Sequence, residues 1–281
     1  MPKSTQKSLK SYPNSKIFSY WDKRVDLSRQ KKGCGFILVF INSKILILST
    51  FFYIVNGNLE KGDYCMIKAI FIDYTGTMVK EDEPYTRELI AYFMAHSDLK
   101  SPGEILKVVW SKVKEIEAGS YGDSFEPVDV RTDRILEYCV ENCGLTGDLK
   151  YMHEVWSKIW VQAPLYDDVK PFFERAKLPI YVLTNDDLCY VEESMRLKEL
   201  KPAGIVSADM AKACKPDLTI FRKAMEVAGV SAEEVIFIGD SVTSDVEPAL
   251  KLGITPIYIS RAKETDIEGI KVIRTLDEVD L

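Results

Sequence analysis

Short apolar runs rich in β-branched residues alternate with helical segments along residues 66–281, and this alternation limits the fold more than any other feature. Apolar runs of roughly four to eight residues are typical of buried strands, and strands that alternate with helices predict a parallel sheet. We expect five such strands, at residues 68–72, 180–183, 204–207, 235–238 and 255–259. The predicted fold class is therefore α/β, with a Rossmann-like parallel sheet as its core.

A long insertion separates the first two predicted strands. Residues 80–164 hold no convincing strand and are far longer than a usual crossover connection. Ser101-Pro102-Gly103-Glu104 matches a capping box with proline at the first helical position. The apolar face predicted for that helix consists of Leu106, Val109, Val113 and Ile116. Similar stripes predict three further helices, so we expect a helical bundle cap at residues 81–164, inserted into a core formed by residues 66–80 and 165–281.

Polar residues follow three of the predicted strands directly. Asp73 comes after the first strand, Thr184 after the second, and Gly239-Asp240 after the fourth. Ligands of open α/β sheets bind at the carboxyl ends of the strands. We therefore expect these residues to share one site.

Charge divides the chain into two parts. Residues 1–65 carry 11 Lys and Arg against 4 Asp and Glu, whereas residues 66–281 carry 26 against 39. An acidic body of this kind lacks the basic surface of a nucleic-acid-binding protein, so no nucleic-acid partner is expected. The six cysteines are scattered through a chain too long to need covalent cross-links, and we interpret them as reduced thiols.

The N-terminal extension, residues 1–65, allows several interpretations. Residues 36–55 form an apolar run, and a membrane-spanning helix needs about 20 such residues. Lys44 in its middle would cost about 2.5–3.5 kcal/mol on insertion. Alternatively, Met66 is the true start, because codons for Lys61-Gly62-Asp63 can spell a purine-rich ribosome-binding sequence. The first interpretation predicts a membrane-anchored protein and the second a cytoplasmic one; an unanchored tail is a third.

Four motifs in sequence order resemble those of the haloacid dehalogenase (HAD) superfamily of hydrolases. They are Asp73-Tyr74-Thr75-Gly76-Thr77, Val182-Leu183-Thr184-Asn185, Lys215-Pro216-Asp217, and a GDxxxxD sequence from Gly239 to Asp245. The resemblance covers residues 67–260 and includes a helical cap inserted between the first and second motifs. It implies a hydrolase that transfers a phosphoryl group from a small phosphorylated metabolite.

The resemblance also assigns roles to individual residues. Asp73 is the expected nucleophile, and aspartate suits this role because its unperturbed pKa of about 3.9 leaves it ionised without a base. Lys215 and Thr184 would contact the phosphate oxygens, with help from Asn185 and the backbone turn at Gly76. The expected Mg²⁺ ligands are the carboxylates of Asp73, Asp240 and Asp245 and the backbone carbonyl of Thr75.

Thr75 departs from the usual hydrolase pattern. Most relatives carry at this position a second aspartate, which protonates the leaving group and then activates water. Threonine cannot carry out this acid–base step, which is typically worth about 10²- to 10⁴-fold in rate. Two hypotheses follow: a slow or narrowly specific phosphatase acting through an aspartyl-phosphate, or a phosphate-binding regulatory or interaction module with impaired hydrolysis. Dehalogenases of the family do not need the metal carboxylates, so Asp240 and Asp245 argue against that activity.

The substrate itself has no sequence signature. Arg87 and Arg131 in the predicted cap match no motif that would fix their role. Residues 118–124 form a glycine-bearing loop between helices, for which contact with substrate and a simple turn are both open.

Overall fold

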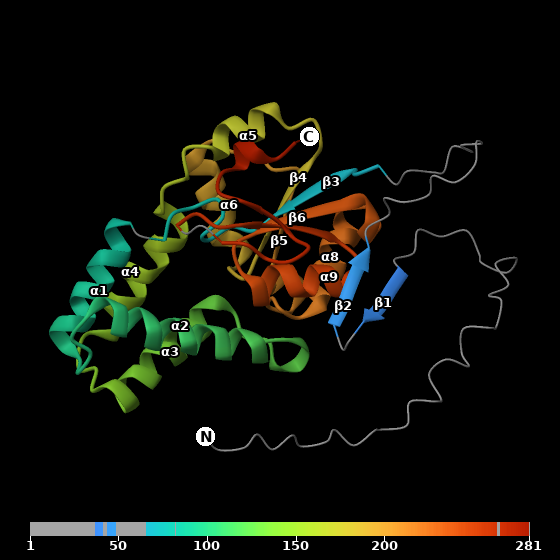
Figure 1. The fold of residues 1–281 in the computed structure, drawn as a ribbon. Helices are drawn as coiled ribbons and strands as arrows, with labels where there is room; N and C mark the ends of the chain where they lie inside the picture. The colour runs from blue at the N-terminus through green and yellow to red at the C-terminus, as the bar shows by residue number, and fades with distance from the viewer. Residues whose placement is uncertain (1–36, 42–43, 49–65, 82, 263–264, 281) are drawn as a thin grey trace, which may run out of the picture. The chain divides into compact units, whose positions relative to one another are not determined.

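The computed structural model describes the chain apart from residues 1–36, 42–43, 49–65, 82, 263–264 and 281 (Figure 1). The chain divides into two compact units, Met1–Phe51 and Phe52–Leu281. In the first unit β1 (Ile37–Ile41) pairs antiparallel with β2 (Lys44–Leu48), and Ile37 lies opposite Leu48. Both strands are rich in Ile, Val and Leu, and β-branched residues favour strands.

This hairpin bears on the apolar run at residues 36–55. The part of the run that the structure describes forms two short strands. Among the helices of the described residues, none combines the length and the apolar character needed to cross a bilayer. Most of residues 1–65 lie outside the described residues, so the interpretations of that segment remain predictions.

The second unit contains a six-stranded parallel sheet, which confirms the predicted α/β fold class. Its strand order is β5-β4-β3-β6-β7-β8. The strands are β3 (Ala69–Ile72), β4 (Ile180–Thr184), β5 (Gly204–Ser207), β6 (Val235–Gly239), β7 (Thr255–Ile259) and β8 (Lys271–Ile273). The five predicted strands match the first five of these to within one residue at each end. The sequence did not predict β8, which is only three residues long.

β3 lies at the centre of the sheet, between β4 and β6, and all four of its residues are buried. Ile70 and Ile72 face one apolar cluster, and Ala69 and Phe71 face another. This alternation follows from the two-residue period of a strand and shows that the sheet is covered on both sides. The order of connections reverses at β3, so its carboxyl end is the topological switch point where α/β sheets bind ligands.

Helices of the core cover the two faces of the sheet (Figure 1). Phe172 of α5 (Val169–Arg175) and Val191 of α6 (Leu188–Lys198) belong to the cluster of Ile70 and Ile72. The opposite cluster contains residues of α8 (Leu218–Ala228) and α9 (Glu247–Leu252). The short elements are α7 (Ala208–Ala211), η4 (Ala232–Glu234), η5 (Val242–Val246) and η6 (Leu276–Glu278).

Residues 81–164, here called the helical insertion, contain four α-helices between β3 and β4. They are α1 (Pro84–His96), α2 (Pro102–Gly119), α3 (Val128–Cys143) and α4 (Leu149–Gln162), with the 3₁₀ turn η3 (Gly122–Ser124) before α3. A third apolar cluster joins them and includes Phe93, Leu136 and Met152. The insertion thus packs around a core of its own, within the same compact unit as the sheet.

The sequence pattern placed the start of α2 correctly but not its whole buried face. The hydroxyl of Ser101 accepts a hydrogen bond from the backbone N–H of Glu104 at 3.3 Å. Ile116 is buried as expected, but Leu106 is 39% exposed and Ile105 is buried in its place. The predicted and the observed faces differ at this position, because Ile105 and Leu106 are both apolar and periodicity alone does not choose between them. In the described part of the chain, the free thiols are those of Cys139, Cys143, Cys189 and Cys214.

Candidate active site

The carboxyl ends of β3, β4 and β6 bring the motif residues together. Ile72 is in register with Val182 on one side and with Ile238 on the other. Asp73, which follows Ile72, is therefore flanked by the ends of both neighbouring strands, and its backbone N–H donates to the carbonyl of Ile238 at 2.8 Å. Three segments that are far apart in sequence thus meet at one edge of the sheet.

Lys215 links two carboxylates of the motifs, those of Asp73 and Asp245. Its Nζ lies 2.5 Å from Oδ1 of Asp73 and 2.7 Å from Oδ1 of Asp245. The side chain of Lys215 is 4% exposed, so this contact is shielded from water. Burial alone would lower the pKa of Lys215, but the carboxylates of Asp245 and Asp73 together raise it above its ordinary value. Lys215 therefore stays charged. The second oxygen of the Asp73 carboxylate, Oδ2, accepts a hydrogen bond from the hydroxyl of Thr77 at 3.2 Å.

Three carboxylates surround this lysine. Asp73, Asp240 and Asp245 each offer an oxygen, and these oxygens all lie within 4.8 Å of one another. Burial and the neighbouring Asp73 and Asp245 raise the pKa of Asp240 well above its ordinary value. Burial also raises the pKa of Asp245 to about 6, although Lys215 opposes the shift. One ammonium group does not balance this cluster, and its hard oxygen donors suit a divalent cation.

Two glycines allow the carboxylates to approach the backbone closely. Gly76 has a φ of +79°, and a Cβ added to it would lie 2.3 Å from Oδ2 of Asp240. A Cβ added to Gly239 would lie 2.5 Å from Oδ2 of Asp245. Gly76 is thus required both for its left-handed backbone and for the space that Asp240 occupies. Oδ2 of Asp245 also accepts a hydrogen bond from the backbone N–H of Ser241 at 2.9 Å.

Asn185 fixes the backbone of Lys215. Its Oδ1 accepts from the backbone N–H of Lys215 at 2.6 Å, and its Nδ2 donates to the carbonyl of Lys215 at 3.2 Å. With this paired contact the amide of Asn185 is committed to the backbone of another loop. The structure shows a positioning contact for Asn185, and the amide contact to phosphate stays a prediction.

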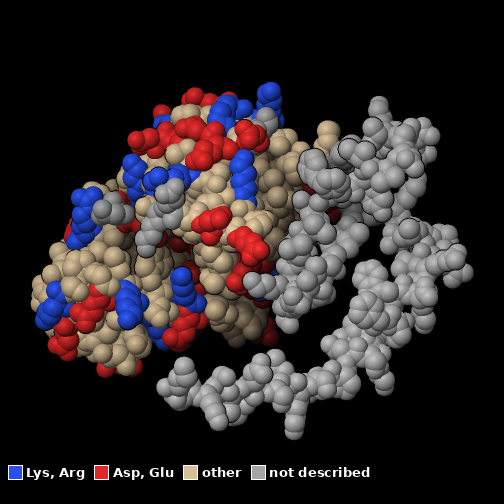
Figure 2. All heavy atoms as spheres, in the orientation of Figure 1, with Lys and Arg blue, Asp and Glu red and all other residues tan. Residues whose placement is uncertain are grey.

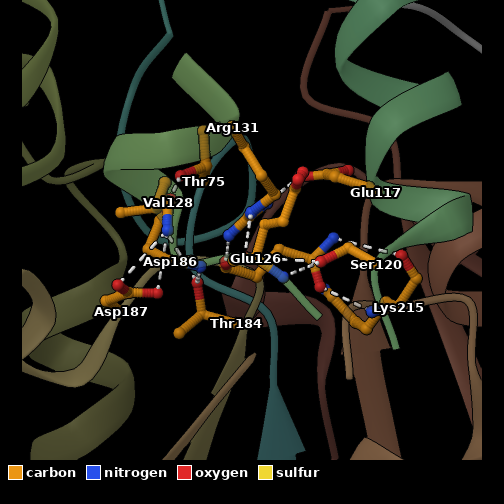
Figure 3. Close-up of polar contacts among 11 residues, drawn as sticks. Thr75, Glu117, Ser120, Glu126, Val128, Arg131, Thr184, Asp186, Asp187 and Lys215 are labelled. Atoms are coloured by element: carbon orange, nitrogen blue, oxygen red, sulfur yellow. Dashed lines mark hydrogen bonds and ion pairs between the residues drawn. The ribbon is translucent and has the colours of Figure 1, made fainter. Parts of the chain in front are cut away.

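Thr184 and Thr75 share one hydrogen-bond partner, Asp186. The hydroxyl of Thr184 donates to Oδ2 of Asp186 at 3.2 Å, and the hydroxyl of Thr75 donates to the same oxygen at 3.4 Å. Figure 3 shows Asp186 between the two threonines. Burial raises the pKa of Asp186 to about 6, with Arg131 and the hydrogen bond from Thr184 opposing the shift. The role of the Thr75 carbonyl as a metal ligand remains a prediction.

Arg131 of the helical insertion reaches the loop that carries Asn185. Its guanidinium donates to the backbone carbonyls of Asn185 and, at 3.1 Å, of Glu126. It also lies 3.3 Å from Oε1 of Glu117 on α2 (Figure 3). Arg131 is 4% exposed, so its hydrogen bonds are made in a dry environment. Arg87 lies on α1, where its backbone N–H donates to the carbonyl of Glu83 at 3.1 Å, and its predicted role stays open.

Three further residue pairs tie the insertion to the core loops. Both carboxylate oxygens of Asp187 lie 3.2 Å from the backbone N–H of Val128, the first residue of α3. In the loop at residues 118–124, the carbonyl of Ser120 accepts from the backbone N–H of Cys214 at 2.9 Å, and Gly122 donates to the carbonyl of Lys212 at 2.8 Å. This loop therefore packs on the segment that leads into Lys215 and is more than a simple turn.

Sequence reasoning missed three side chains at this site. Asp186, Thr77 and Glu117 all lie among the motif residues, yet none was assigned a role. A role for Thr77 could have been predicted from the sequence, because it belongs to the first motif and stands four residues after Asp73. Asp186 and Glu117 carry no such signal, since only the fold places them here.

Comparisons with known proteins agree with this architecture. The family model for haloacid dehalogenase-like hydrolases matches residues 67–253, and the chain belongs to this family. A curated relative, glyceraldehyde 3-phosphate phosphatase of Methanocaldococcus jannaschii, is 23% identical over 209 residues, which cover 72% of this chain and 89% of that protein.

Solved structures share the fold at low sequence identity. The HAD hydrolase YfnB of Bacillus subtilis, solved bound to magnesium, has a TM-score of 0.60 and 16% identity, covering 76% of this chain and 96% of that one. L-2-haloacid dehalogenase from Xanthobacter autotrophicus has a TM-score of 0.62 and 19% identity with the same coverage. These likenesses show the fold, and they include both dehalogenases and other HAD hydrolases.

Proposed function

We propose that this chain is a Mg²⁺-dependent phosphatase that acts through phosphorylated Asp73 on a small phosphorylated metabolite. The observation that carries the proposal is the contact of Lys215 with both Asp73 and Asp245 inside a group of three carboxylates. This arrangement combines a buried nucleophile with positive charge directed at it and with oxygen ligands for a cation. The phosphatase relative from Methanocaldococcus jannaschii supports the same activity.

The residues of this chain suit a two-step transfer. In the first step a carboxylate oxygen of Asp73 forms a bond to phosphorus, and the bond from phosphorus to the substrate oxygen breaks. In the second step water attacks phosphorus and the carboxylate of Asp73 is released. Lys215 is placed to stabilise negative charge on the phosphoryl oxygens. Thr184 lies at the same strand end with its hydroxyl donated to Asp186, and it would contact the phosphate by turning from that partner.

The three carboxylates fit Mg²⁺. Asp73, Asp240 and Asp245 would hold the ion, together with the carbonyl of Thr75, which is expected from the family resemblance. When bound, the ion would neutralise charge on the carboxylates and on the phosphate. The raised pKa of Asp240 supports this proposal, because burial and then repulsion from Asp73 and Asp245 disfavour its negative charge, which a cation would stabilise.

We further propose that the helical insertion acts as a cap over the site. The contacts of Arg131 with Asn185, and of the loop at residues 118–124 with the Lys212–Cys214 segment, support this role. A cap that excludes water suits a small substrate rather than a macromolecule. Figure 2 shows acidic and basic side chains interspersed on one face of the protein. Because this face carries no single sign of charge, a phosphate would be attracted by groups inside the site, such as Lys215, rather than by the surface.

A second candidate function is a phosphate-binding module with impaired hydrolysis. Thr75 favours it, because the position lacks the carboxylate that most phosphatases of the family use. The two functions differ in turnover: a module would bind phosphate esters and Mg²⁺ without releasing phosphate.

The test is phosphate release by the full-length chain across a panel of phosphorylated metabolites that includes glyceraldehyde 3-phosphate. Release is measured with Mg²⁺ and with EDTA, beside the variant Asp73→Asn, which keeps the shape of the side chain but removes the nucleophile. We expect Mg²⁺-dependent release that falls by at least about 10³-fold in the variant. Equal rates for the two proteins would show that Asp73 is not the nucleophile.

A further inference from the structure

Asp186 is a carboxylate at the site for which the family motifs give no role. It stands two residues after Thr184, in the loop between β4 and α6. Its Oδ2 accepts hydrogen bonds from the hydroxyls of both Thr75 and Thr184, and its backbone N–H donates to the hydroxyl oxygen of Thr184 at 3.1 Å. The carboxylate missing at position 75 therefore has a counterpart that touches Thr75 from the loop after β4.

The loop that carries Asp186 is held on both sides. Asn185 is paired with the backbone of Lys215, and Asp187 accepts from the first N–H of α3. These contacts fix the backbone before and after Asp186, so its side chain is presented to Thr75 by a fixed segment. It also lies close enough to Asp73 for their charges to interact.

The direction of the hydrogen bond determines what Thr75 can offer. A threonine hydroxyl has one hydrogen and two lone pairs. When the hydrogen is donated to Asp186, the oxygen of Thr75 presents only its lone pairs to other groups. It can then accept a hydrogen bond from water beside Asp73, but it cannot donate one to the phosphate.

We propose that Asp186 is a positioning residue, which holds the hydroxyl of Thr75 so that its oxygen orients the water that attacks phosphorylated Asp73. The inference rests on the proposed phosphatase function and concerns only its second step. Thr75 touches the water, and Asp186 acts through Thr75.

The step balances without a proton acceptor on the protein. The water oxygen forms a bond to phosphorus, the bond from phosphorus to Asp73 breaks, and its electron pair returns to the Asp73 carboxylate. One water hydrogen remains on the new phosphate oxygen, where it bonds to Thr75. The other passes to a second phosphoryl oxygen, so the product leaves as dihydrogen phosphate.

The experiment uses the full-length chain with Mg²⁺ and p-nitrophenyl phosphate as the probe. Because p-nitrophenolate leaves without an acid catalyst, a rapid burst of it reports phosphorylation of Asp73, and the slow phase reports hydrolysis. We expect Thr75→Val and Asp186→Ala each to keep a burst near one equivalent per chain. Each should slow the second phase by about 10- to 10²-fold, as misplacement of a reacting group does.

The double variant separates positioning from a general structural effect. If Asp186 acts through Thr75, adding Asp186→Ala to Thr75→Val should cause almost no further loss. Asp186→Asn, which keeps one acceptor oxygen, should fall between the wild type and Asp186→Ala and remains informative if the alanine variant does not fold. Asp209→Asn is the matched control, because its carboxylate accepts from the hydroxyl of Ser207 and the backbone N–H of Leu188, away from Thr75, and the variant should match the wild type.

Two results would overturn the inference. One is a slow phase in Asp186→Ala equal to that of the wild type, and the other is a double variant slowed by the product of the two single effects. If the wild type shows neither a burst nor Mg²⁺-dependent phosphate release, the proposed function fails instead, and the inference falls with it.

Discussion

Two groups of polar and charged side chains lie at the same end of the sheet and are built differently. The nucleophile cluster comes from the core motifs and consists of Asp73, Lys215, Asp240 and Asp245. The insertion-facing cluster joins a core loop to the helical insertion and consists of Glu117, Arg131, Asn185 and Asp186. The first has three carboxylates for one ammonium group. In the second, each nitrogen of the guanidinium of Arg131 has a partner in a backbone carbonyl or a carboxylate.

This difference in charge balance indicates different roles for the two clusters. Charges that do not balance within the protein favour binding of external ions, here a cation and a phosphate. Charges satisfied by backbone carbonyls instead fix the relative position of two chain segments. We therefore expect substitutions in the nucleophile cluster to change binding and chemistry, and substitutions in the insertion-facing cluster to change positioning and stability.

The largest effect should come from removing a ligand in the nucleophile cluster. Asp240→Asn should lower Mg²⁺-dependent phosphate release by about 10³-fold, since it removes a ligand and several kcal/mol of charge stabilisation. Without metal the same variant should gain about 2–4 °C in melting temperature, because one repelling charge is gone. Activity assays and thermal unfolding in EDTA measure the two effects. A metal-free variant less stable than the metal-free wild type would contradict the view that this cluster is unbalanced.

An intermediate effect is expected at Thr75, where the two clusters meet. Thr75→Asp supplies the carboxylate that acid–base catalysis uses, typically worth about 10²- to 10⁴-fold. Repulsion from Asp186 should reduce the benefit, so we expect phosphate release to rise by about 10²-fold at most. The measurement is the steady-state rate on the best substrate of the panel, with Thr75→Asn as a matched control. A protein that remains inert with Asp at this position would instead be a binding module.

The smallest effect should be a pH dependence of stability at Glu117. Burial raises the pKa of Glu117 to about 7 from an ordinary 4.5, against the opposing charge of Arg131. The folded protein then keeps a proton that the unfolded chain loses, so the free energy of unfolding falls as the pH rises from 4.5 to 7. Glu117→Gln removes this dependence.

Urea unfolding at pH 5 and pH 7.5 measures the Glu117 effect. The stability of Glu117→Gln relative to the wild type should increase by about 2 kcal/mol between these pH values. Glu115→Gln is the control, because Glu115 lies on the same helix and its side chain is 69% exposed. A constant difference between Glu117→Gln and the wild type would show that Arg131 keeps the carboxylate ionised throughout.

The core of the fold could be predicted because its signals are local. Each of the five predicted strands is a short apolar run, and the ends of three of them place Asp73, Thr184 and Asp240 without knowledge of distant contacts. β8 was missed because three residues are too few for a periodic pattern. The buried face of α2 was misplaced by one residue for the related reason that both Ile105 and Leu106 are apolar.

The insertion-facing cluster could not be predicted in the same way. Asp187 stands directly before α6 and has the sequence of an ordinary N-terminal cap, yet its side chain makes no cap contact within α6. It accepts instead from Val128, 59 residues earlier in the chain. Asp186 beside it faces Thr75, and no spacing rule relates the two. Contacts between segments brought together only by folding leave no local trace in the sequence.

The trans-capping of α3 by Asp187 has a consequence for protein engineering. Exchanging residues 81–164 for the equivalent segment of another family member would separate Val128 from the carboxylate that satisfies its N–H. The core of this protein would keep Asp187 without the α3 N–H that it accepts from. The first helix N–H at the corresponding place in the transplanted segment would lack a carboxylate partner. Residues 185–187 therefore belong with the graft, although they lie outside its boundaries in the sequence.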